Sequence, residues 1–315
     1  MDWSLDETQA AIRELAPKIL ATKDDPWAAI VNAGLLEVIT MTQVCSLVVE
    51  VGRAGGTVPV LETLVLGGPL RVLSRIPRDA ILTAGLLEPT SRNPRHATTE
   101  FRDGRLYGTK ICVPVADRAS HIVVPAKDGL YAASLADCAV ELQAGTNDEV
   151  VATVVLDGAP ALPLGTMRDL DRYLLRVDLG ISALLLGLSH GALALTAKYV
   201  SDREQFSRKI GTFQAVSQRA ADAWIDTQAM EVTLFQAAWR MDEEFGSHRE
   251  VAIARYTAAE ASHRVLASAQ HLHGGIGFDR DYPLYRYFLT AKAWEFVLGG
   301  ASAQLERLGE ILAEG

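Results

Sequence analysis

Cysteine is scarce in this sequence of 315 residues, which holds only Cys45, Cys112 and Cys138. The three are widely spaced and stand among apolar residues, a pattern typical of reduced core thiols and unlike a disulfide framework or a zinc site. The seven histidines have no acidic partners at a zinc-like spacing either. The sequence therefore predicts no disulfides and no metal centre.

Basic residues are also in deficit. Lys and Arg number 30 against 39 Asp and Glu, which gives a formal net charge of −9 at pH 7. No cluster of Lys or Arg supplies the electrostatic footprint that nucleic-acid binding requires. We therefore expect no nucleic-acid partner.

Neither a leader peptide nor a membrane-spanning segment is expected from the sequence. Residues 1–7 are acidic and contain neither the basic region nor the apolar region of a targeting peptide. The most apolar stretch, residues 181–197, includes two serines, a histidine and a glycine, and is barely long enough to cross a bilayer. We expect this stretch to be a buried bundle helix of a cytoplasmic protein.

Apolar residues make up 49% of the chain, enough for a large core, and their periodicity changes twice. The pattern predicts short helices up to about residue 73, and strands with Asp-Gly turns from about 81 to 164. Long helices follow almost to the end. The predicted fold is mostly α with a small β-domain, in three parts: an N-terminal helical domain (1–76), a middle β-barrel-like domain (77–165) and a C-terminal four-helix bundle (166–315).

Two segments of the predicted bundle combine a cation, an aromatic ring, an amide and glycines. Six residues carry this pattern: Arg203, Phe206, Gln214, His271, Gly274 and Gly275. A guanidinium group can bind phosphate oxygens through two parallel hydrogen bonds, and a glycine pair lets a backbone approach a pyrophosphate closely. The pattern favours a nucleotide site. The alternatives are a solvated face for Arg203, a core position for Phe206 and an ordinary helix cap for the glycines.

In order and spacing these elements resemble the C-terminal domain of the acyl-CoA dehydrogenase family, and the order of the three predicted domains extends the resemblance to the whole chain. The resemblance implies FAD-dependent α,β-dehydrogenation of an acyl-CoA thioester, with electron-transfer flavoprotein or a similar acceptor. It also implies that Arg203, Phe206, Gln214, Gly274 and Gly275 hold the adenosine diphosphate part of an FAD whose ring lies mainly in a neighbouring subunit. His271 is expected to line the same groove.

The catalytic base is the least clear part of the resemblance. The family places a glutamate either before the last helix, where this chain has Leu298 and Gly299, or on the helix that leads to the glycine pair. Glu260 lies on that helix and is the candidate that removes the α-proton. An ion pair with Arg264, four residues on, is the alternative role, and Glu295 is a weaker candidate for the base.

Two departures from the family pattern fall in the predicted β-domain. Residues 87–94 contain Leu-Glu-Pro without the Gly-Ser-Asp that usually follows, and residues 110–114 lack the aromatic platform for the flavin ring. The N-terminal domain is also short. The chain thus resembles the smaller subunits of actinobacterial α2β2 acyl-CoA dehydrogenases, which implies a longer dehydrogenase partner and a bulky, steroid-derived acyl-CoA. A non-catalytic partner that completes the FAD site, or a self-sufficient oxidase or dehydrogenase, stays open.

Overall fold

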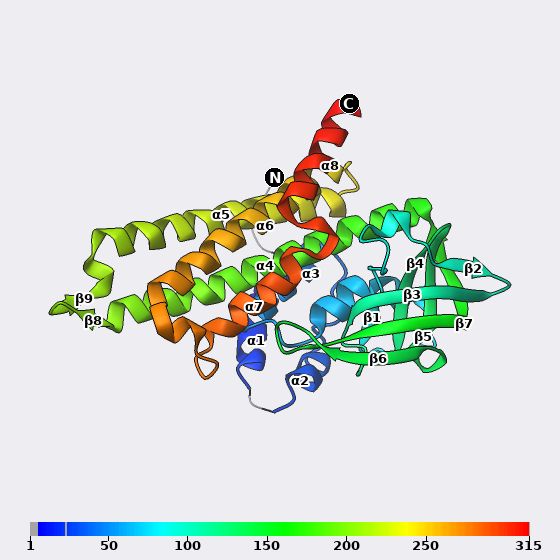
Figure 1. Ribbon diagram of the computed structural model, residues 1–315, viewed down its shortest axis with the longest axis horizontal. Coiled ribbons are helices and arrows are strands. Elements are labelled where there is room, and N and C mark those ends of the chain that lie inside the picture. The colour runs from blue at the N-terminus through cyan, green and yellow to red at the C-terminus, as the bar shows by residue number, and fades with distance from the viewer. Residues whose placement is uncertain (1–5, 23, 315) are drawn as a thin grey trace. The chain divides into compact units, whose positions relative to one another are not determined.

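The computed structural model describes residues 6–22 and 24–314 (Figure 1). The chain divides into two compact units. The helical unit contains residues 1–26, 37–58 and 178–315, and the sheet unit contains residues 27–36 and 59–177. The division of the sequence at residues 76 and 165 stays a prediction.

The helical unit is a bundle built around long helices. Its helices are α1 (Glu7–Leu20), α3 (Met41–Arg53), the C-terminal part of α4 (Met167–Asp202), α5 (Gln214–Asp242), α6 (His248–His273), α7 (Leu284–Glu295) and α8 (Gly300–Glu314). Asp6 and Thr40 begin α1 and α3 with capping boxes, in which the third helical residue, Gln9 or Gln43, bonds back to the cap. Helix α6 packs against both α5 and α8. This confirms the predicted mostly helical fold with a bundle in the C-terminal part.

Helix α4 holds the apolar stretch of the sequence. It is 36 residues long, and 78% of its most apolar window is buried inside the protein. Gly187 of α4 packs against Gly52 of α3 so closely that a Cβ on either residue would collide with the backbone of the other helix. The stretch is therefore the buried bundle helix that its interruptions by polar residues predicted, while the cytoplasmic location stays a prediction.

The sheet unit is built around a seven-stranded sheet. Its strands are β1 (Leu82–Ala84), β2 (Glu100–Arg102), β3 (Arg105–Pro114), β4 (His121–Ala126), β5 (Gly129–Ser134), β6 (Ala139–Ala144) and β7 (Val150–Thr166). The unit also contains α2 (Pro26–Asn32), the π-helical turn η1 (Glu62–Leu66), short 3₁₀ turns and the first turns of α4. The order is β1-β4-β5-β7-β3-β2, with β6 also paired to β7. Only β1 and β4 run parallel.

Strand β7 corrects one expectation. The Asp-Gly turns expected between residues 81 and 164 include Asp157-Gly158, but β7 continues through this pair to Thr166. Gly158 has φ +75°, and the pairing with β3 shifts register between Leu106 and Tyr107. The pair therefore forms an irregularity that lets one long strand pair with β3 at one end and with β5 at the other.

Cys112 corrects a second expectation. The apolar surroundings predicted three core thiols, but only Cys45 is buried, and Cys112 is exposed. Cys112 has φ +52° at a register shift between Lys110 and Val113 of β3, which turns its side chain out of the regular strand alternation.

Glu62 begins the π-helical turn η1 and is only 9% exposed. Burial raises the pKa of its carboxyl from 4.5 to about 7, and the negative charge of Glu149 acts in the same direction. The folded chain therefore holds the Glu62 proton more tightly than the unfolded chain does. The contribution of Glu62 to the free energy of unfolding therefore falls as the pH rises from 4.5 through 7, by about 3 kcal/mol in total.

Glu62→Gln is expected to remove this loss because the amide cannot ionise. We expect the free energy of unfolding of the variant, relative to the unsubstituted chain, to rise by about 3 kcal/mol between pH 4.5 and pH 8. Urea unfolding at the two pH values measures this difference. A difference that stays the same at both pH values would contradict the buried carboxyl.

Candidate cofactor site at the end of the bundle

A tight hairpin joins α4 to α5. Its strands β8 (Glu204–Gln205) and β9 (Arg208–Lys209) pair so that Phe206 and Ser207 form the two-residue turn. Both turn residues have positive φ, 53° and 62°, which this type of turn requires but which phenylalanine rarely adopts. The turn leaves Phe206 89% exposed, with an edge contact to Phe213 at 6.3 Å between ring centroids. Phe206 is thus an exposed ring held in a costly backbone conformation, contrary to a core position.

Arg203 lies at the base of this hairpin. Its backbone N–H donates to Tyr199 O at 2.9 Å, and its carbonyl accepts from Ile210 N at 2.9 Å, so both sides of the backbone are fixed. The guanidinium group is exposed and has no hydrogen-bonding or ion-pair partner among the described residues. The nearby Lys209 instead pairs with Glu204 at 2.9 Å. Arg203 therefore presents an available cationic fork on a rigid backbone.

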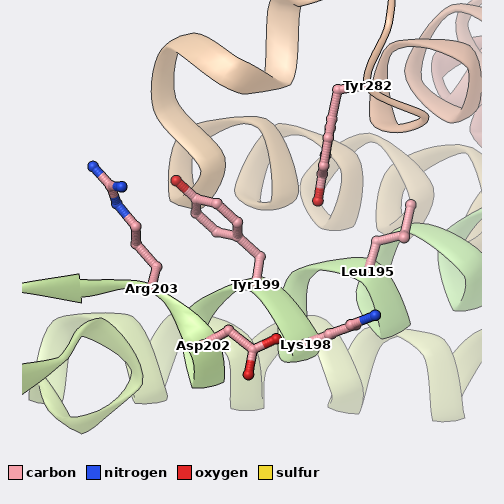
Figure 2. Close-up of a pocket in the computed structure, with 6 residues that line it drawn as sticks. All are labelled: Leu195, Lys198, Tyr199, Asp202, Arg203 and Tyr282. Carbon is pink, nitrogen blue, oxygen red and sulfur yellow. The ribbon is translucent and has the colours of Figure 1, made fainter.

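A pocket of about 400 Å³ opens beside Arg203. It is lined by Leu195, Lys198, Tyr199, Asp202, Arg203 and Tyr282. Figure 2 shows Tyr199 and Arg203 extending from the C-terminal end of α4, while Tyr282 points toward α4 from the segment opposite. Two aromatic rings and two cations at one opening can bind a planar, anionic ligand such as a nucleotide.

His273 connects this pocket to the glycine pair. Its ring stacks on Tyr199 at 4.5 Å between centroids, and its Nε2 lies 3.0 Å from the Tyr282 hydroxyl. Nδ1 lies 2.8 Å from Ala269 O, so Nδ1 carries the proton and Nε2 accepts from Tyr282. Burial lowers the pKa of His273, which keeps the ring neutral and this arrangement intact.

The glycine pair follows His273 directly, at the end of α6. Gly274 has φ +61°, and its N–H bonds back to the carbonyl groups of Gln270 and His271. A Cβ on Gly274 or Gly275 would meet nothing within 4 Å, so this backbone is open to an incoming group. Because Tyr282 both lines the Arg203 pocket and bonds His273, Arg203 and Gly274 lie at the same end of the bundle.

The remaining two predicted cofactor residues also fall at this end. Gln214 is the exposed first residue of α5, directly after the hairpin, and His271 is exposed in the last turn of α6. The start of α5 lies beside the last turns of α6, since Ala215 and Ala267 line one groove. The structure thus gathers the predicted cofactor residues, and adds Lys198, Tyr199 and Tyr282. Of these, Tyr282 was visible in the sequence only as the residue before a helix-starting proline.

Glu260 lies elsewhere. It stands thirteen residues before the end of α6, about 20 Å along the helix from the glycine pair. Its side chain is 45% exposed and pairs with Arg264 at 3.3 Å, while Arg264 also makes two bonds to Asp226 of α5, at 3.0 and 2.6 Å. The observed geometry is the ion pair that the sequence offered as the alternative role. Catalysis by Glu260 stays a prediction.

Among the described residues, the segment before α8 offers no other free carboxylate. Leu298 occupies the expected loop position with φ +60°, and Gly299 and Gly300 also have positive φ. The buried Arg255 fixes this kink by donating to the carbonyl groups of Glu295 and Val297, both at 2.9 Å. Glu295 itself is 10% exposed at the side chain and pairs with Lys292 at 2.5 Å. Its carboxylate is therefore already engaged in an ion pair.

The two segments of the sheet unit that depart from the family pattern lie next to each other, since Leu87 bridges Ile111. Beneath them Lys110, fully buried, donates to Glu88 at 2.6 Å. The carboxylate of Glu88 also accepts from the backbone and hydroxyl groups of Thr98 and Thr99. A buried ion pair therefore fills the interior here, and the exposed residue between Ile111 and Val113 is Cys112 rather than an aromatic ring.

Comparison with known proteins gives a consistent set of relatives. Residues 176–313 match the family model described as acyl-CoA dehydrogenase, C-terminal domain. The chain is 35% identical to acyl-CoA dehydrogenase FadE27 of Mycobacterium tuberculosis, over 91% of this chain and 88% of that protein. It is 30% identical to FadE28 of the same organism, over 98% of each.

Solved structures agree with these relatives. A chain of the ChsE4-ChsE5 complex from Mycobacterium tuberculosis superimposes with a TM-score of 0.89 at 32% identity, over all of both chains. A chain of the Tcur3481-Tcur3483 steroid ACAD, as a G363A variant, gives the same TM-score and identity over 98% of each chain. Butyryl-CoA dehydrogenase from Megasphaera elsdenii, at 18% identity and a TM-score of 0.85, shares the fold.

Proposed function

Because this chain belongs to the acyl-CoA dehydrogenase family, FAD-using oxidoreductases that act on CH–CH bonds, we propose that it works as one subunit of a hetero-oligomeric dehydrogenase. In this proposal a longer dehydrogenase subunit binds the flavin ring, and this chain supplies the contacts to the adenosine end of the same FAD. The proposed reaction is α,β-dehydrogenation of a bulky, steroid-derived acyl-CoA.

The observation that carries the proposal is the exposed guanidinium group of Arg203, which has no ion-pair partner in the part of the chain that the structure describes and lies at the same end of the bundle as an open glycine backbone. A diphosphate fits this set of donors, because the fork can bind two of its oxygens while backbone groups approach at Gly274 and Gly275. Tyr199, Tyr282 and the exposed Phe206 offer apolar faces to an adenosine group. The residues present therefore suit the adenosine end of FAD, which when bound supplies the hydride acceptor of the reaction.

The proposed roles of the two subunits depend on the residues that this chain has at the expected positions of the base and of the aromatic platform. Leu298 occupies the loop position of the base, Glu260 is tied to Arg264, and Cys112 stands where an aromatic platform was expected. We infer that the base and the contacts to the flavin ring come from the longer subunit. Two structural relatives at 32% identity are a chain of the ChsE4-ChsE5 complex and a chain of the Tcur3481-Tcur3483 steroid ACAD, which supports both the partner and the substrate class.

An activity assay tests the proposed reaction. The complex purified after co-expression with a longer dehydrogenase chain is expected to reduce an artificial electron acceptor when given a steroid-derived acyl-CoA. This chain alone is expected to give no turnover. Turnover by this chain alone, or hydrogen peroxide production without an added acceptor, would instead indicate a self-sufficient dehydrogenase or oxidase.

Glu260→Gln tests where the base resides. A general base contributes roughly 10²- to 10⁴-fold to the rate, so its loss would be unmistakable. Since Glu260 is half-exposed and paired with Arg264, we expect the variant complex to keep kcat/KM within about threefold of the unsubstituted complex. Asp226→Asn is the matched control, because it removes the other partner of Arg264. A loss of roughly 100-fold or more in Glu260→Gln alone would make Glu260 the base.

A further inference from the structure

Tyr282 reaches the cofactor pocket from an exposed loop. The four residues before it, 278–281, are all exposed. Asp279 closes the loop, because its side chain accepts from the N–H of Asp281 at 2.9 Å and its carbonyl accepts from the N–H of Tyr282 at 3.1 Å. A loop with so few buried contacts does not by itself fix the ring that it carries. The place of the Tyr282 ring therefore depends on the contacts of the ring itself.

His273 supplies a rigid anchor for this ring. It is 4% exposed, and its ring lies at a tilt to that of Tyr282, with 5.2 Å between the centroids. The turn that leads into the loop packs on the same part of α6, since a Cβ on Gly277 would lie 3.3 Å from the Cβ of His273 and 2.2 Å from Gln270 Oε1. The imidazole is therefore fixed beneath the loop, and its hydrogen bond with Tyr282 sets where the Tyr282 ring lies.

The direction of this hydrogen bond determines what Tyr282 can offer a ligand. Nδ1 of His273 donates to Ala269 O, so Nε2 has only a lone pair and the hydroxyl of Tyr282 must donate to it. Burial raises the pKa of Tyr282, so the hydroxyl keeps the proton that it donates. Because a phenol has a single proton, the Tyr282 oxygen can act toward a ligand in the pocket only as an acceptor.

The two parts of a nucleotide respond differently to such an acceptor. The oxygens of a diphosphate accept hydrogen bonds, so they suit Arg203 and Lys198, the two cations of the pocket, and do not suit Tyr282. The ribose hydroxyls and the amino group of a nucleoside are donors, which Tyr282 can accept. Asp202 also lines the pocket and is a second acceptor. The pocket therefore combines donors for a diphosphate with acceptors for a nucleoside.

We propose that His273 is a positioning residue of this pocket, which holds Tyr282 as an acceptor for the nucleoside part of the bound nucleotide, while Arg203 binds the diphosphate. The inference rests on the proposed function for the identity of that nucleotide as FAD. His273 is not among the residues that line the pocket, so it acts through Tyr282.

His273→Asn and His273→Gln are a matched pair of variants. The Asn amide can still donate to Ala269 O but ends short of Tyr282, whereas the longer Gln side chain places an acceptor near the position of Nε2. In the complex co-expressed with a longer dehydrogenase chain, we expect His273→Asn to raise the Kd of FAD roughly 3- to 10-fold, the effect of one neutral hydrogen bond. His273→Gln is expected to stay within about twofold of the unsubstituted complex. Equal losses in the two variants would overturn the inference.

Tyr282→Phe tests whether His273 acts through the Tyr282 hydroxyl. In a chain that already carries Tyr282→Phe, His273→Asn is expected to cause no further loss of FAD affinity, because the hydroxyl that it positions is gone. The same loss with and without Tyr282→Phe would mean that His273 acts by packing alone, and would overturn the inference.

Competition with fragments of the nucleotide tests which part Tyr282 binds. We expect His273→Asn to weaken competition by ADP roughly 3- to 10-fold and to leave competition by inorganic pyrophosphate within about twofold. Equal weakening of both competitors would overturn the assignment of Tyr282 to the nucleoside.

Hydrogen exchange at the amide of Tyr282, measured on this chain alone, gives a result that needs no flavin. That amide donates to Asp279 O, so we expect faster exchange in His273→Asn and unchanged exchange in His273→Gln. Absence of flavin from the unsubstituted complex would contradict the proposed function, and hydrogen exchange would then decide the positioning role. Equal exchange rates in the two variants would overturn that role.

Discussion

Lys110→Met is expected to destabilise the chain by about 3–5 kcal/mol, because it leaves the buried carboxylate of Glu88 without its cation. Lys110 is fully buried and donates to both Glu88 Oε1, at 2.6 Å, and Pro125 O, at 2.7 Å. Although burial raises the pKa of Glu88, the hydrogen bonds from Lys110, Thr98 and Thr99 outweigh it and hold that pKa at about 2. Glu88 is therefore ionised at neutral pH and needs a compensating charge.

The free energy of unfolding in urea measures the effect, and a double-mutant cycle assigns it to the pair. Glu88→Gln combined with Lys110→Met is expected to recover part of the loss, because the amide removes the unpaired charge and its one oxygen can still accept from Thr99, whereas its nitrogen cannot accept from the N–H of Thr98. Lys127→Met is the control: it breaks the exposed pair with Glu100 in the same unit and should leave the unfolding free energy almost unchanged. A loss below about 1 kcal/mol for Lys110→Met would contradict a buried ion pair.

The same pair sets an acid limit. The pKa of Glu88 lies below its unfolded value of 4.5, so the folded chain binds its proton less tightly than the unfolded chain does. The stabilisation that Glu88 provides is complete above pH 4.5 and is lost as the pH falls toward 2. Glu62, whose pKa is raised, acts in the opposite direction between pH 4.5 and 7.

Arg203→Ala is expected to weaken FAD binding by the co-expressed complex roughly 10- to 100-fold. Hydrogen bonds that involve a charged group contribute about 1.5–3 kcal/mol, and the fork of Arg203 can form two of them with a diphosphate. Arg203→Lys should recover only part of the affinity, because an ammonium group cannot bind two oxygens in the same geometry. Titration of the flavin-free complex with FAD, followed by flavin fluorescence, gives the dissociation constants.

Arg208→Ala is the matched control for Arg203. Arg208 lies in the same hairpin and is also exposed, but its guanidinium group stands over the ring of Phe213 at 4.0 Å to the centroid. We expect its removal to change FAD affinity much less than removal of Arg203. Equal losses in the two variants would show that net positive charge of the hairpin, and not the fork of Arg203, binds the cofactor.

The placement of the predicted cofactor residues at one end of the bundle could be predicted from the sequence, because they belong to short motifs at the ends of strongly periodic helices. Arg203 and Gln214 flank a short loop, and Gly274 ends a helix, so local rules place each of them correctly. The links between them could not be predicted. Tyr199, His273 and Tyr282 meet only through tertiary packing, and a histidine beside a glycine pair gives no sign of its hydrogen-bond partner.

Charged residues in the interior were the main features that the sequence did not disclose. Glu88 and Lys110 are 22 residues apart, and sheet pairing, which single-sequence patterns specify poorly, brings them together. Sheet pairing with β3 and β5 likewise extends β7 through Asp157-Gly158, where the local signal predicted a turn. In both cases long-range contacts decided the outcome against a local preference.

Flavin content per chain and assembly mass, measured for this protein alone and after co-expression with a longer dehydrogenase chain, test the proposed shared site most directly. We expect no bound FAD for this chain alone, and about one FAD for each pair of chains in the complex. One FAD per chain in an assembly of this protein alone would contradict it, and would make the chain a self-sufficient flavoenzyme.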